Sequence, residues 1–349
     1  MFKVEAQVEL ASRTTMGVGG RATHYVRVES AAELPEALAW AKARGLEVRV
    51  LGGGSNVVVA DAGFAGLVIE MAIRGIRSAN YGGTVEVRAS AGEPWDDFVS
   101  AMVSRGYQGL ECLSGIPGRV GATPIQNVGA YGQDVSETIS KLTTLDCVSG
   151  EERVFSGTEC RFSYRDSFFK SVEPGRFVVT EVTFLLKPGG APAIRYAELE
   201  RYFKEQGNTA PSLAETRETV IRLRRSKSMV LDANDPNSRS CGSFFMNPML
   251  AASAFTAFCE RARDEGDVPS FPQGDGRVKL SAGWLIEHAG LPRGTRDGAV
   301  GLSTKHALAL VAHAGARAED VARLASTVQR TVRARFGVEL TPEPVFWGF

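Results

Sequence analysis

Two glycine-rich stretches can bring bare main chain against a ligand. The first is LGGGSN, residues 51–56, and the second is GIPGRVGATPIQNVGAYG, residues 115–132, which holds five glycines and one charged residue, Arg119. Glycine loses much backbone freedom on folding, so such clusters are costly unless a tight turn or a close ligand requires them. Successive N–H groups turned inward form an anion nest, which suits a diphosphate in a region with few cations. A hairpin turn at 51–56 and a connector at 115–132 are the structural alternatives.

The presence of both stretches favours one extended ligand held from two sides. Glycine lets the backbone approach a flat ring or a phosphate closely. The side-chain amides of Gln126 and Asn127 can hydrogen-bond ring edges. A bound flavin nucleotide would require such contacts to its flat ring and its phosphates.

Other nucleotide-binding signatures are missing or out of place. No GxxxxGK[ST] occurs, which argues against a P-loop. GVGGRA, residues 17–22, fits GxGxxA, but it follows RTTM rather than an apolar strand and opens no helix. A dinucleotide-binding Rossmann fold requires both contexts and is therefore excluded.

Composition excludes several classes of protein. Forty basic and forty acidic residues give a net charge of zero, which leaves no electrostatic footprint for nucleic acid or an anionic membrane. The five cysteines, at 112, 147, 160, 241 and 259, include no CxxC pair, so neither a metal site nor a disulfide scaffold is expected. The N-terminus lacks an apolar signal core, and ALALVAHAG at 307–315 is too short to span a bilayer. We predict a soluble, cytoplasmic protein.

The pattern of predicted elements indicates the α+β class, because strands and helices mix without strict alternation. PGGAP, residues 188–192, is the clearest break in the chain. Strands are predicted within 46–60 on either side of a turn, at 64–71, 84–92 and 176–187, and in a hairpin that turns at Ser149–Gly150; helices are predicted at 33–45, 94–106, 213–228, 281–290 and 318–337.

Six motifs occur in the order of one known family. They are LGGGSNVVV, GLECLSGIPGRVGATPIQNVGAYGQDV at 109–135, YRDSFFK at 164–170, CGSFFMNP at 241–248, KLSAGWLIEHAG at 279–290 and LTPEPVFWG at 340–348. Together they closely resemble the UDP-N-acetylenolpyruvoylglucosamine reductase family, over essentially the whole chain.

The resemblance implies an α+β protein with an FAD-binding fold of the vanillyl-alcohol-oxidase type in two subdomains, followed by a smaller α+β substrate-binding domain. FAD-binding subdomains are expected at 1–72 and 73–230, the second with a connecting loop at 189–230. A substrate domain is expected at 231–336, and a return segment at 337–349 carries Glu343. NADPH is the implied reductant. Relatives with this fold can attach flavin through histidine, but none of the four histidines lies in a glycine loop, so FAD is expected to be noncovalent.

The resemblance places Arg165, Ser243 and Glu343 in a catalytic trio. Hydride would pass from flavin N5 to C3 of the enolpyruvyl group and leave an enolate. Arg165 and Glu343, the latter protonated or bridging, would stabilise that enolate, a contribution of about 10²–10³ in rate for one preorganised donor. Ser243 would protonate C2, a role worth roughly 10²–10⁴. Taken singly, the same residues are typical of an ion pair, a turn and an exposed glutamate.

The resemblance also implies a set of ligand contacts. Tyr196 matches the substrate-closing tyrosine loop of one branch of the family, Lys227 approaches substrate, and Asn247 contacts its phosphate or sugar. Glu287 and His288 line the same cleft or belong to a packed helix. The expected cofactor contacts are Leu51, Gly52, Gly53, Gly54, Ser55, Asn56, Ser114, Gly115, Ile116, Pro117, Gly118, Gly121, Ala122, Gln126, Asn127, Gly129, Ala130, Tyr131 and Gly132.

Two departures from the family pattern stand out. Met246 replaces a common lysine, so a cation near the diphosphate is missing, and DPNS at 235–238 looks like an insertion that alters only a surface loop. The leading hypothesis is an NADPH-dependent flavoenzyme of peptidoglycan precursor synthesis that acts on a UDP-sugar. NADPH and substrate would use one cleft in turn, on a monomer or weak dimer. A flavin oxidase using O₂ and a noncatalytic nucleotide-binding protein are the alternatives.

Overall fold

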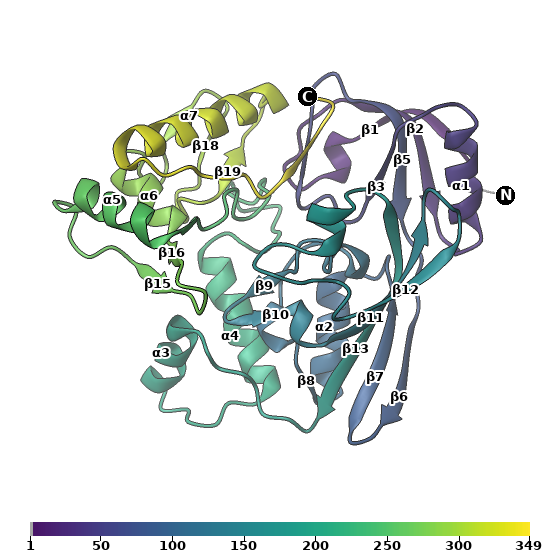
Figure 1. The fold of residues 1–349 in the computed structure, drawn as a ribbon, viewed down its shortest axis with the longest axis horizontal. Coiled ribbons are helices and arrows are strands. Elements are labelled where there is room, and N and C mark those ends of the chain that lie inside the picture. The colour runs from purple at the N-terminus through teal and green to yellow at the C-terminus, as the bar shows by residue number, and fades with distance from the viewer. Residues whose placement is uncertain (1–2) are drawn as a thin grey trace. The chain divides into compact units, whose positions relative to one another are not determined.

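The computed structural model describes residues 3–349 and groups the chain into two compact units (Figure 1). Unit 1 comprises Met1–Val8, Ala22–Gly53 and Ala65–Ser226. Unit 2 comprises Glu9–Arg21, Gly54–Phe64 and Lys227–Phe349. This grouping assigns residues 9–21 and 54–64 to the C-terminal unit, which the predicted division at 72 and 230 did not.

The first sheet of unit 1 has four strands. Its order is β1 (Glu5–Glu9), β2 (Arg21–Val28), β5 (Phe64–Met71), β3 (Val48–Leu51), with β3 and β5 parallel. Helix α1 (Glu33–Lys42) buries Leu34, Ala37 and Ala41 among the apolar residues of β2 and β5. Gly45 then takes a left-handed φ of 63°, which ends the predicted helix as expected.

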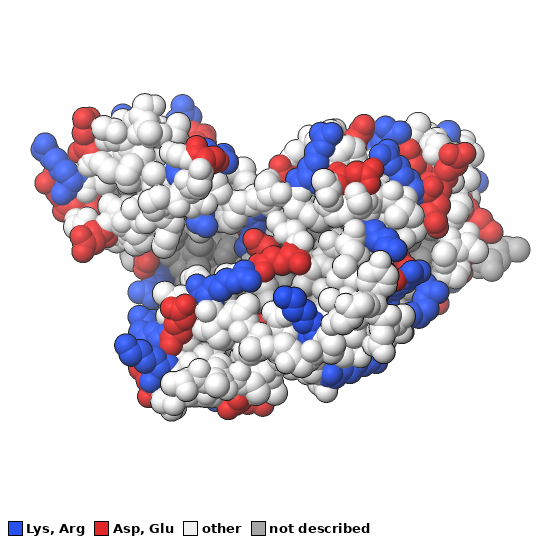
Figure 2. Space-filling view, turned by 60° about the horizontal axis from the view of Figure 1, so that its bottom comes forward, with Lys and Arg blue, Asp and Glu red and all other residues white. Residues whose placement is uncertain are grey.

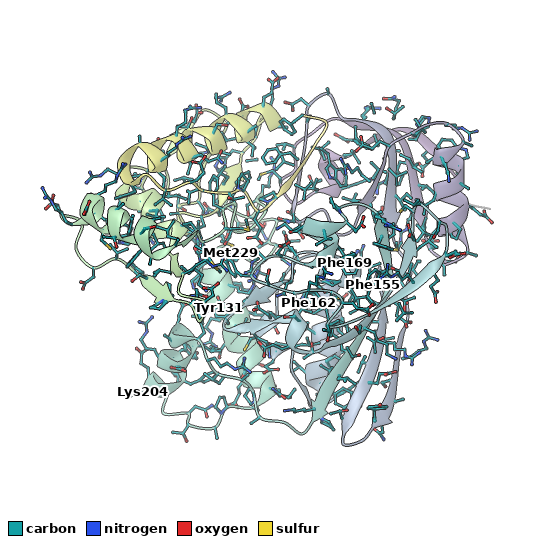
Figure 3. The ribbon with its side chains drawn as sticks, viewed as in Figure 1. Tyr131, Phe155, Phe162, Phe169, Lys204 and Met229 are labelled. Carbon is teal, nitrogen blue, oxygen red and sulfur yellow. The ribbon has the colours of Figure 1, made fainter. Side chains whose placement is uncertain are left out.

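The second sheet of unit 1 has six strands and carries most of its core. Helix α2 (Trp95–Ser104) contributes Trp95 and Phe98 to that core, and both rings pack on Phe184. Phe155, Phe162 and Phe169, labelled in Figure 3, belong to or pack against the same core. The strand order is β12 (Glu152–Ser156), β11 (Ile139–Asp146), β13 (Phe177–Pro188), β7 (Thr84–Ser90) and β6 (Ile76–Tyr81), with β8 (Tyr107–Gln108) also on β13.

Shorter elements complete unit 1. The predicted connecting loop 189–230 contains two helices, α3 (Ala197–Glu205) and α4 (Leu213–Ser226). Strands β9 (Gly129–Ala130) and β10 (Gln133–Asp134) form a small hairpin. The helical turns are η2 (Glu111–Leu113), η3 (Val120–Ala122), η4 (Val135–Glu137) and the π-helical η5 (Phe168–Val172).

Unit 2 is built around α7 (Ala318–Phe336), whose apolar residues recur every three or four positions and face its core. Gly337 ends it in the left-handed conformation, as predicted. Strand β4 (Val57–Val59) pairs in parallel with β20 (Val345–Trp347). The other elements are η1 (Ala11–Arg13), α5 (Ala252–Ala262), α6 (Ala282–His288), a sheet of β14 (Met249–Leu250), β16 (Val278–Leu280) and β15 (Ser270–Pro272), and a sheet of β17 (Arg296–Asp297), β18 (Val300–Leu302) and β19 (Leu310–Ala312).

The surface agrees with the balanced composition. On the face drawn in Figure 2, basic and acidic side chains are interspersed. Within residues 3–349, no helix is long and apolar enough to cross a membrane, and no group of three or more His, Cys, Asp or Glu residues is placed to hold a metal ion. The α+β class is confirmed.

Candidate active site

The glycine-rich loop 115–132 of unit 1 is fastened to the chain around helix α2. The Gly115 N–H donates to Asp96 Oδ1 at 2.6 Å, and the Gly118 carbonyl accepts from Trp95 N–H at 3.1 Å. The Gly121 N–H donates to the Ala91 carbonyl at 2.9 Å, and a Cβ on Gly121 would overlap the Ala91 side chain. The close packing at Gly121 therefore excludes a larger residue.

Gly53 and Gly118 bring the two glycine-rich stretches into direct contact, whereas the sequence predicted only that both would hold one ligand. A Cβ on Gly53 would lie 2.6 Å from the Gly118 Cα, which no folded chain tolerates. Among the described residues, the N–H groups of Ile116 and Gly118 have no hydrogen-bond acceptor. Two main-chain segments thus meet directly and leave donors for a ligand.

The turn at 51–56 is not a hairpin, so that alternative is wrong. The strand before it, β3, pairs with β5, whereas β4 after it pairs with β20. Gly54 is buried with a φ of 64°, and its Cβ would overlap the Arg13 carbonyl. Within residues 3–349, the N–H groups of Gly53 and Gly54 donate no hydrogen bond. A buried N–H without an acceptor is rare in a finished fold, and a phosphate oxygen satisfies it well.

Three non-glycine residues around the 115–132 loop have left-handed backbone. The φ angles are 47° at Asn127, 50° at Tyr131 and 55° at Arg165. Such strain concentrates at functional sites. The Asn127 amide is already used within the protein, because Nδ2 donates to the Ser163 carbonyl at 2.9 Å and Oδ1 accepts from Ser136 N–H at 3.2 Å. Its observed role is therefore to brace the loop.

Arg165 is held at the end of the glycine-rich loop. Its Nη2 donates to the Gly129 carbonyl at 2.6 Å, and Nη1 lies 3.8 Å from Asp134 Oδ1. Its side chain is 19% exposed, and Lys170 Nζ donates to its carbonyl at 2.7 Å. A Cβ on Gly129 would overlap Asp134 and lie 3.0 Å from Arg165 Nη1. Glycine at 129 thus makes room for the guanidinium.

Ser243 and Glu343 are brought together within unit 2. The Glu343 N–H donates to the Phe244 carbonyl at 2.8 Å, and Phe245 and Pro342 form a bridge beside it. The Glu343 carbonyl also accepts from Asn56 Nδ2 at 3.3 Å. The partly exposed Ser243 hydroxyl has no hydrogen-bond partner among residues 3–349, so it can meet a ligand. Arg165, the third predicted catalytic residue, belongs to unit 1.

Tyr131 and Tyr196 form an edge-to-face pair in unit 1. Their ring centroids lie 5.3 Å apart at 80°, and Tyr131 is labelled in Figure 3. Burial raises the pKa of both phenols, so each stays protonated and able to donate at neutral pH. Tyr196 immediately precedes α3 and is 43% exposed. The predicted substrate tyrosine thus rests against the end of the predicted cofactor loop.

The remaining predicted substrate residues lie in unit 2, where several already have protein partners. Asn247 Oδ1 accepts from the Ala282 N–H at 2.9 Å, at the start of α6. His288 stacks on Trp284 with centroids 3.9 Å apart, and Glu287 pairs with Arg293 at 2.9 Å. The packed-helix alternative accounts for these contacts of Glu287 and His288. Lys227, partly buried, follows the end of α4.

Cys241, beside the serine motif, is not a nucleophile. It is buried, and burial raises the pKa of its thiol to about 12. Its Sγ lies 3.6 Å from the Val57 carbonyl. The thiol is therefore protonated at neutral pH, in agreement with a packing role.

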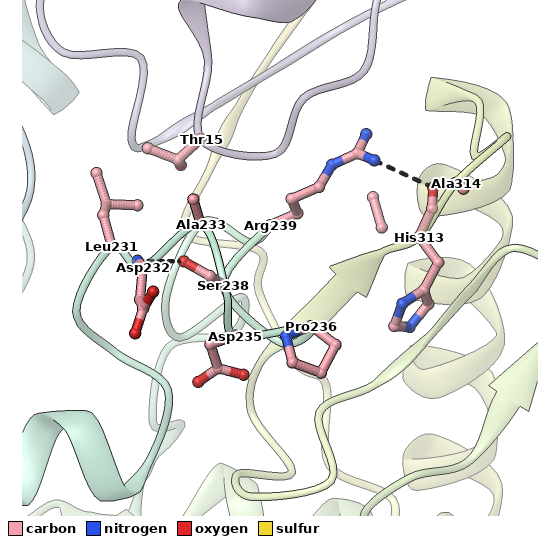
Figure 4. A pocket seen from close by; sticks show the side chains of 11 residues that line it. Thr15, Leu231, Asp232, Ala233, Asp235, Pro236, Ser238, Arg239, His313 and Ala314 are labelled. Carbon is pink, nitrogen blue, oxygen red and sulfur yellow. Dashed lines mark hydrogen bonds between the residues drawn. The ribbon is translucent and has the colours of Figure 1, made fainter.

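Residues 235–238, the predicted insertion, are more than a surface loop, which corrects that part of the prediction. Asn237 is 6% exposed, and its Oδ1 accepts from the Thr304 N–H at 3.0 Å. Lys305 Nζ lies 3.6 Å from Asp235 Oδ2. The insertion also borders an open pocket of about 640 Å³ in unit 2, drawn in Figure 4 and lined by Thr15, Leu231, Asp232, Ala233, Asp235, Pro236, Ser238, Arg239, Ala312, His313 and Ala314.

Sequence reasoning missed Thr15 and Arg239. Thr15 donates from its N–H to the Gly54 carbonyl at 3.0 Å and from Oγ1 to the Ser240 carbonyl at 2.6 Å. Arg239 donates to the Gly17 carbonyl at 2.7 Å. The available signal is the segment RTTMGVGG, whose glycines match a Rossmann fingerprint only superficially. It instead ties the glycine turn to the serine motif.

Comparison with known proteins gives a consistent result. Residues 22–156 match a family model described as an FAD binding domain, and residues 235–347 match the C-terminal domain of UDP-N-acetylenolpyruvoylglucosamine reductase. The enzyme of that name from Thermobifida fusca is 49% identical over 348 residues, covering 98% of this chain and 97% of the relative. The one from Salinispora arenicola is 48% identical over 347 residues, covering 98% and 95%.

A solved structure supports the same assignment. The crystal structure of UDP-N-acetylenolpyruvylglucosamine reductase from Thermus caldophilus covers 99% of this chain and 100% of its own, with a TM-score of 0.68 and 27% identity. The predicted FAD-binding fold is confirmed by these matches. The chain belongs to the UDP-N-acetylenolpyruvoylglucosamine reductase family.

Proposed function

We propose that this chain is the FAD-dependent oxidoreductase that reduces UDP-N-acetylglucosamine enolpyruvate to UDP-N-acetylmuramate for peptidoglycan synthesis, with NADPH as the source of hydride. The observation that carries the proposal is the direct approach of Gly53 to Gly118, beside main-chain N–H groups without acceptors. These donors fit the diphosphate and ring edges of a flavin nucleotide. Because the chain belongs to the UDP-N-acetylenolpyruvoylglucosamine reductase family, reduction of the enolpyruvyl sugar is the flavoenzyme reaction to test.

Bound FAD supplies hydride transfer to carbon. The stretches 51–56 and 115–132 would hold it through main-chain N–H groups, which need no cations. None of the four histidines lies in either stretch, which argues against a histidyl link and supports noncovalent FAD. Asn127 acts indirectly in this scheme, because its amide braces the loop through Ser163 and Ser136.

The side chains of Arg165, Ser243 and Glu343 stabilise the negative charge that forms during the reaction and supply the proton that completes it. When hydride adds to C3 of the enolpyruvyl group, charge develops on the carboxylate as an enolate. Arg165, oriented by the Gly129 carbonyl, stabilises that charge together with Glu343, which acts in its protonated form or bridges through a shared proton. Ser243, whose hydroxyl has no protein partner among the described residues, delivers the proton to C2. One hydride and one proton thus saturate the double bond.

Substrate contacts complete the proposal. Tyr196 and Lys227 bind the UDP-sugar, with Asn247, Glu287 and His288 beside it. NADPH and the sugar occupy the site in turn, which gives ping-pong kinetics. Cytoplasmic location and a monomeric or weakly dimeric state stay predictions.

Separate half-reactions test the function with Ser243→Ala. NADPH should bleach the flavin of this variant at the wild-type rate, while reoxidation by the enolpyruvyl sugar should fall by about 10²–10⁴. Ser253→Ala, on the exposed surface of α5, is the matched control and should match wild type in both steps. If Ser243→Ala reoxidises normally with the sugar, Ser243 is not the acid.

The wild-type protein decides between the broader alternatives. Reoxidation of the reduced flavin by the enolpyruvyl sugar, much faster than by O₂, is expected. Efficient turnover with O₂ alone would indicate an oxidase. A purified protein that neither contains nor takes up FAD would be a noncatalytic nucleotide-binding protein.

A further inference from the structure

Glu111 is a fully buried carboxylate that the proposed mechanism does not use. It lies in η2, directly before the glycine-rich loop, and is 0% exposed. Its Oε2 accepts from the Gly109 N–H at 2.8 Å. Its Oε1 accepts from the Ala193 N–H at 3.0 Å and from Gln133 Nε2 at 3.4 Å. Burying a carboxylate is costly, so three converging donors indicate a specific task.

The main chain at Ala193 is held from both sides. Its N–H donates to Glu111, while Cys112 Sγ donates to its carbonyl at 3.5 Å. Gln133, which contacts Glu111, accepts from the Cys112 N–H at 3.0 Å. Residues of η2 and β10 therefore clamp a segment that is distant from them in sequence.

The clamped segment runs straight to Tyr196. Arg195 lies against the β9–β10 hairpin, where a Cβ on Gly132 would be 3.2 Å from the Arg195 Cβ. The next residue, Tyr196, places its ring on Tyr131 at 5.3 Å. Leu199 of α3 then packs in a small core with Cys112. Fixing Ala193 thus fixes the start of α3 and the tyrosine before it.

We propose that Glu111 is a positioning residue, which holds segment 193–196 so that Tyr196 meets the UDP-sugar in one defined place. The inference rests on the proposed function, since it takes Tyr196 as a substrate contact. Glu111 acts by removing alternative positions of the segment before substrate binds, which lowers the entropy cost of binding. It contacts neither the sugar nor the reacting atoms.

Two substitutions test this role. Glu111→Gln replaces one carboxylate oxygen by an NH₂ group. That NH₂ group must then face the N–H of Gly109 or of Ala193, so one of the two hydrogen bonds is lost. Ala193→Pro removes the N–H donor and keeps the Glu111 side chain, but its ring also fixes φ at residue 193. Both variants should raise KM for the enolpyruvyl sugar by about tenfold or more, since a hydrogen bond to a charged group is lost. The rate of flavin reduction by NADPH should stay within about twofold of wild type.

Glu137→Gln is the matched control. It weakens the ion pair between Arg195 Nη1 and Glu137 Oε2, which lie 2.9 Å apart and hold the same segment. This pair is on the surface, with the Arg195 side chain 56% exposed and the Glu137 side chain 35% exposed. Surface pairs contribute little, so KM should be unchanged. Denaturant titration first establishes that wild type and Ala193→Pro are both folded. Equal KM values for the two proteins would then overturn the role of Glu111.

A double-mutant cycle checks that the effect passes through Tyr196. Once Tyr196→Ala has removed the ring, Glu111→Gln should raise KM little further. Additive effects would show that Glu111 acts elsewhere. If the wild type itself fails to transfer hydride from NADPH to the enolpyruvyl sugar, the proposed function is wrong. If the wild type turns over normally and the variants have the wild-type KM, only the inference about Glu111 is wrong.

Discussion

The Arg217 guanidinium binds both oxygens of the Asp96 carboxylate, at 2.6 and 2.9 Å. Asp96 Oδ1 also accepts from the Gly115 N–H at 2.6 Å. One carboxylate therefore links α2, α4 and the start of the glycine-rich loop. The Arg217 side chain is only 15% exposed, so this pair is better protected from solvent than most of the ion pairs on the surface.

Asp96→Asn should destabilise unit 1 and weaken FAD binding. The amide keeps one acceptor oxygen but loses the charge and the paired geometry, at a cost of about 1–2 kcal/mol in unfolding free energy. Denaturant titration and flavin fluorescence titration measure the two effects. Asp97→Asn, on the neighbouring exposed residue, is the control and should leave both values unchanged.

The stabilisation by Asp96 should depend on pH. Burial acts to raise the pKa of Asp96, but the hydrogen bonds from Arg217 and Gly115 outweigh it and lower the pKa. A depressed carboxyl pKa contributes stability above the unfolded value of about 4 and loses it as pH falls through the folded value. The difference in unfolding free energy between wild type and Asp96→Asn should therefore shrink below about pH 4. A constant difference down to pH 2 would contradict this account.

Arg165→Lys should separate the two half-reactions. Lysine keeps the charge but cannot present a planar fork to both the Gly129 carbonyl and an enolate. Reoxidation of reduced flavin by the enolpyruvyl sugar should slow by about 10²–10³, with NADPH-driven reduction retained. Stopped-flow absorbance of the flavin resolves both steps. Equal slowing of the two steps would instead indicate a disturbed cofactor loop.

Gly129→Ala should displace Arg165 and distort the β9–β10 hairpin. The added methyl would overlap the Asp134 carboxylate and crowd Arg165 Nη1 at 3.0 Å. Overpacking of this kind costs about 1–3 kcal/mol of folding free energy. Gly274→Ala has open space around the new methyl group and is the control. The measurement is denaturant unfolding, together with turnover of the enolpyruvyl sugar.

Alkylation should distinguish the cysteines by burial. Burial raises the pKa of Cys112, Cys160 and Cys241 to about 12 each, so about one thiol in 10⁴ is ionised at pH 8. Cys259 is exposed. Iodoacetamide followed by mass spectrometry should label Cys259 first and leave activity intact. Rapid labelling of Cys241 with loss of activity would contradict its assignment as a packed, protonated thiol.

Asn237→Ala should destabilise unit 2. Its buried Oδ1 accepts from both the N–H and the hydroxyl of Thr304, at 3.0 and 3.3 Å. Removing the acceptor leaves a backbone donor without a partner, at a cost of about 1–3 kcal/mol by denaturant titration. Asn234→Ala, on an exposed neighbour, should have no measurable effect.

Elements with a complete local pattern were predictable from the sequence. Helix α7 has an apolar stripe and a C-terminal glycine, and strand β5 is apolar except for Glu70, so both were located nearly to the residue. Strand β6 was missed because it is almost wholly exposed at a sheet edge and has no apolar alternation. Helix α3 was missed because only Leu199 and Phe203 of its nine residues are buried.

The candidate site was predictable where glycine spacing defined it. The two glycine-rich stretches indicated where main chain would pack closely. Neither the contact of Gly53 with Gly118 nor the bracing role of Asn127 was predicted, because their partners are set by the folded chain. Glu111 carried no signal either, since an isolated glutamate in a sequence is normally exposed. Long-range partners decide such roles, and one sequence does not contain them.

The pairing of β4 with β20 makes this ladder a late step in folding. Val57 and Val345 are partners in it although they lie far apart in the sequence. Closing so long a loop costs conformational entropy before the pair returns any stability, and contacts of this kind slow folding. Deleting Val345–Trp347 would leave three consecutive valines without their parallel neighbour.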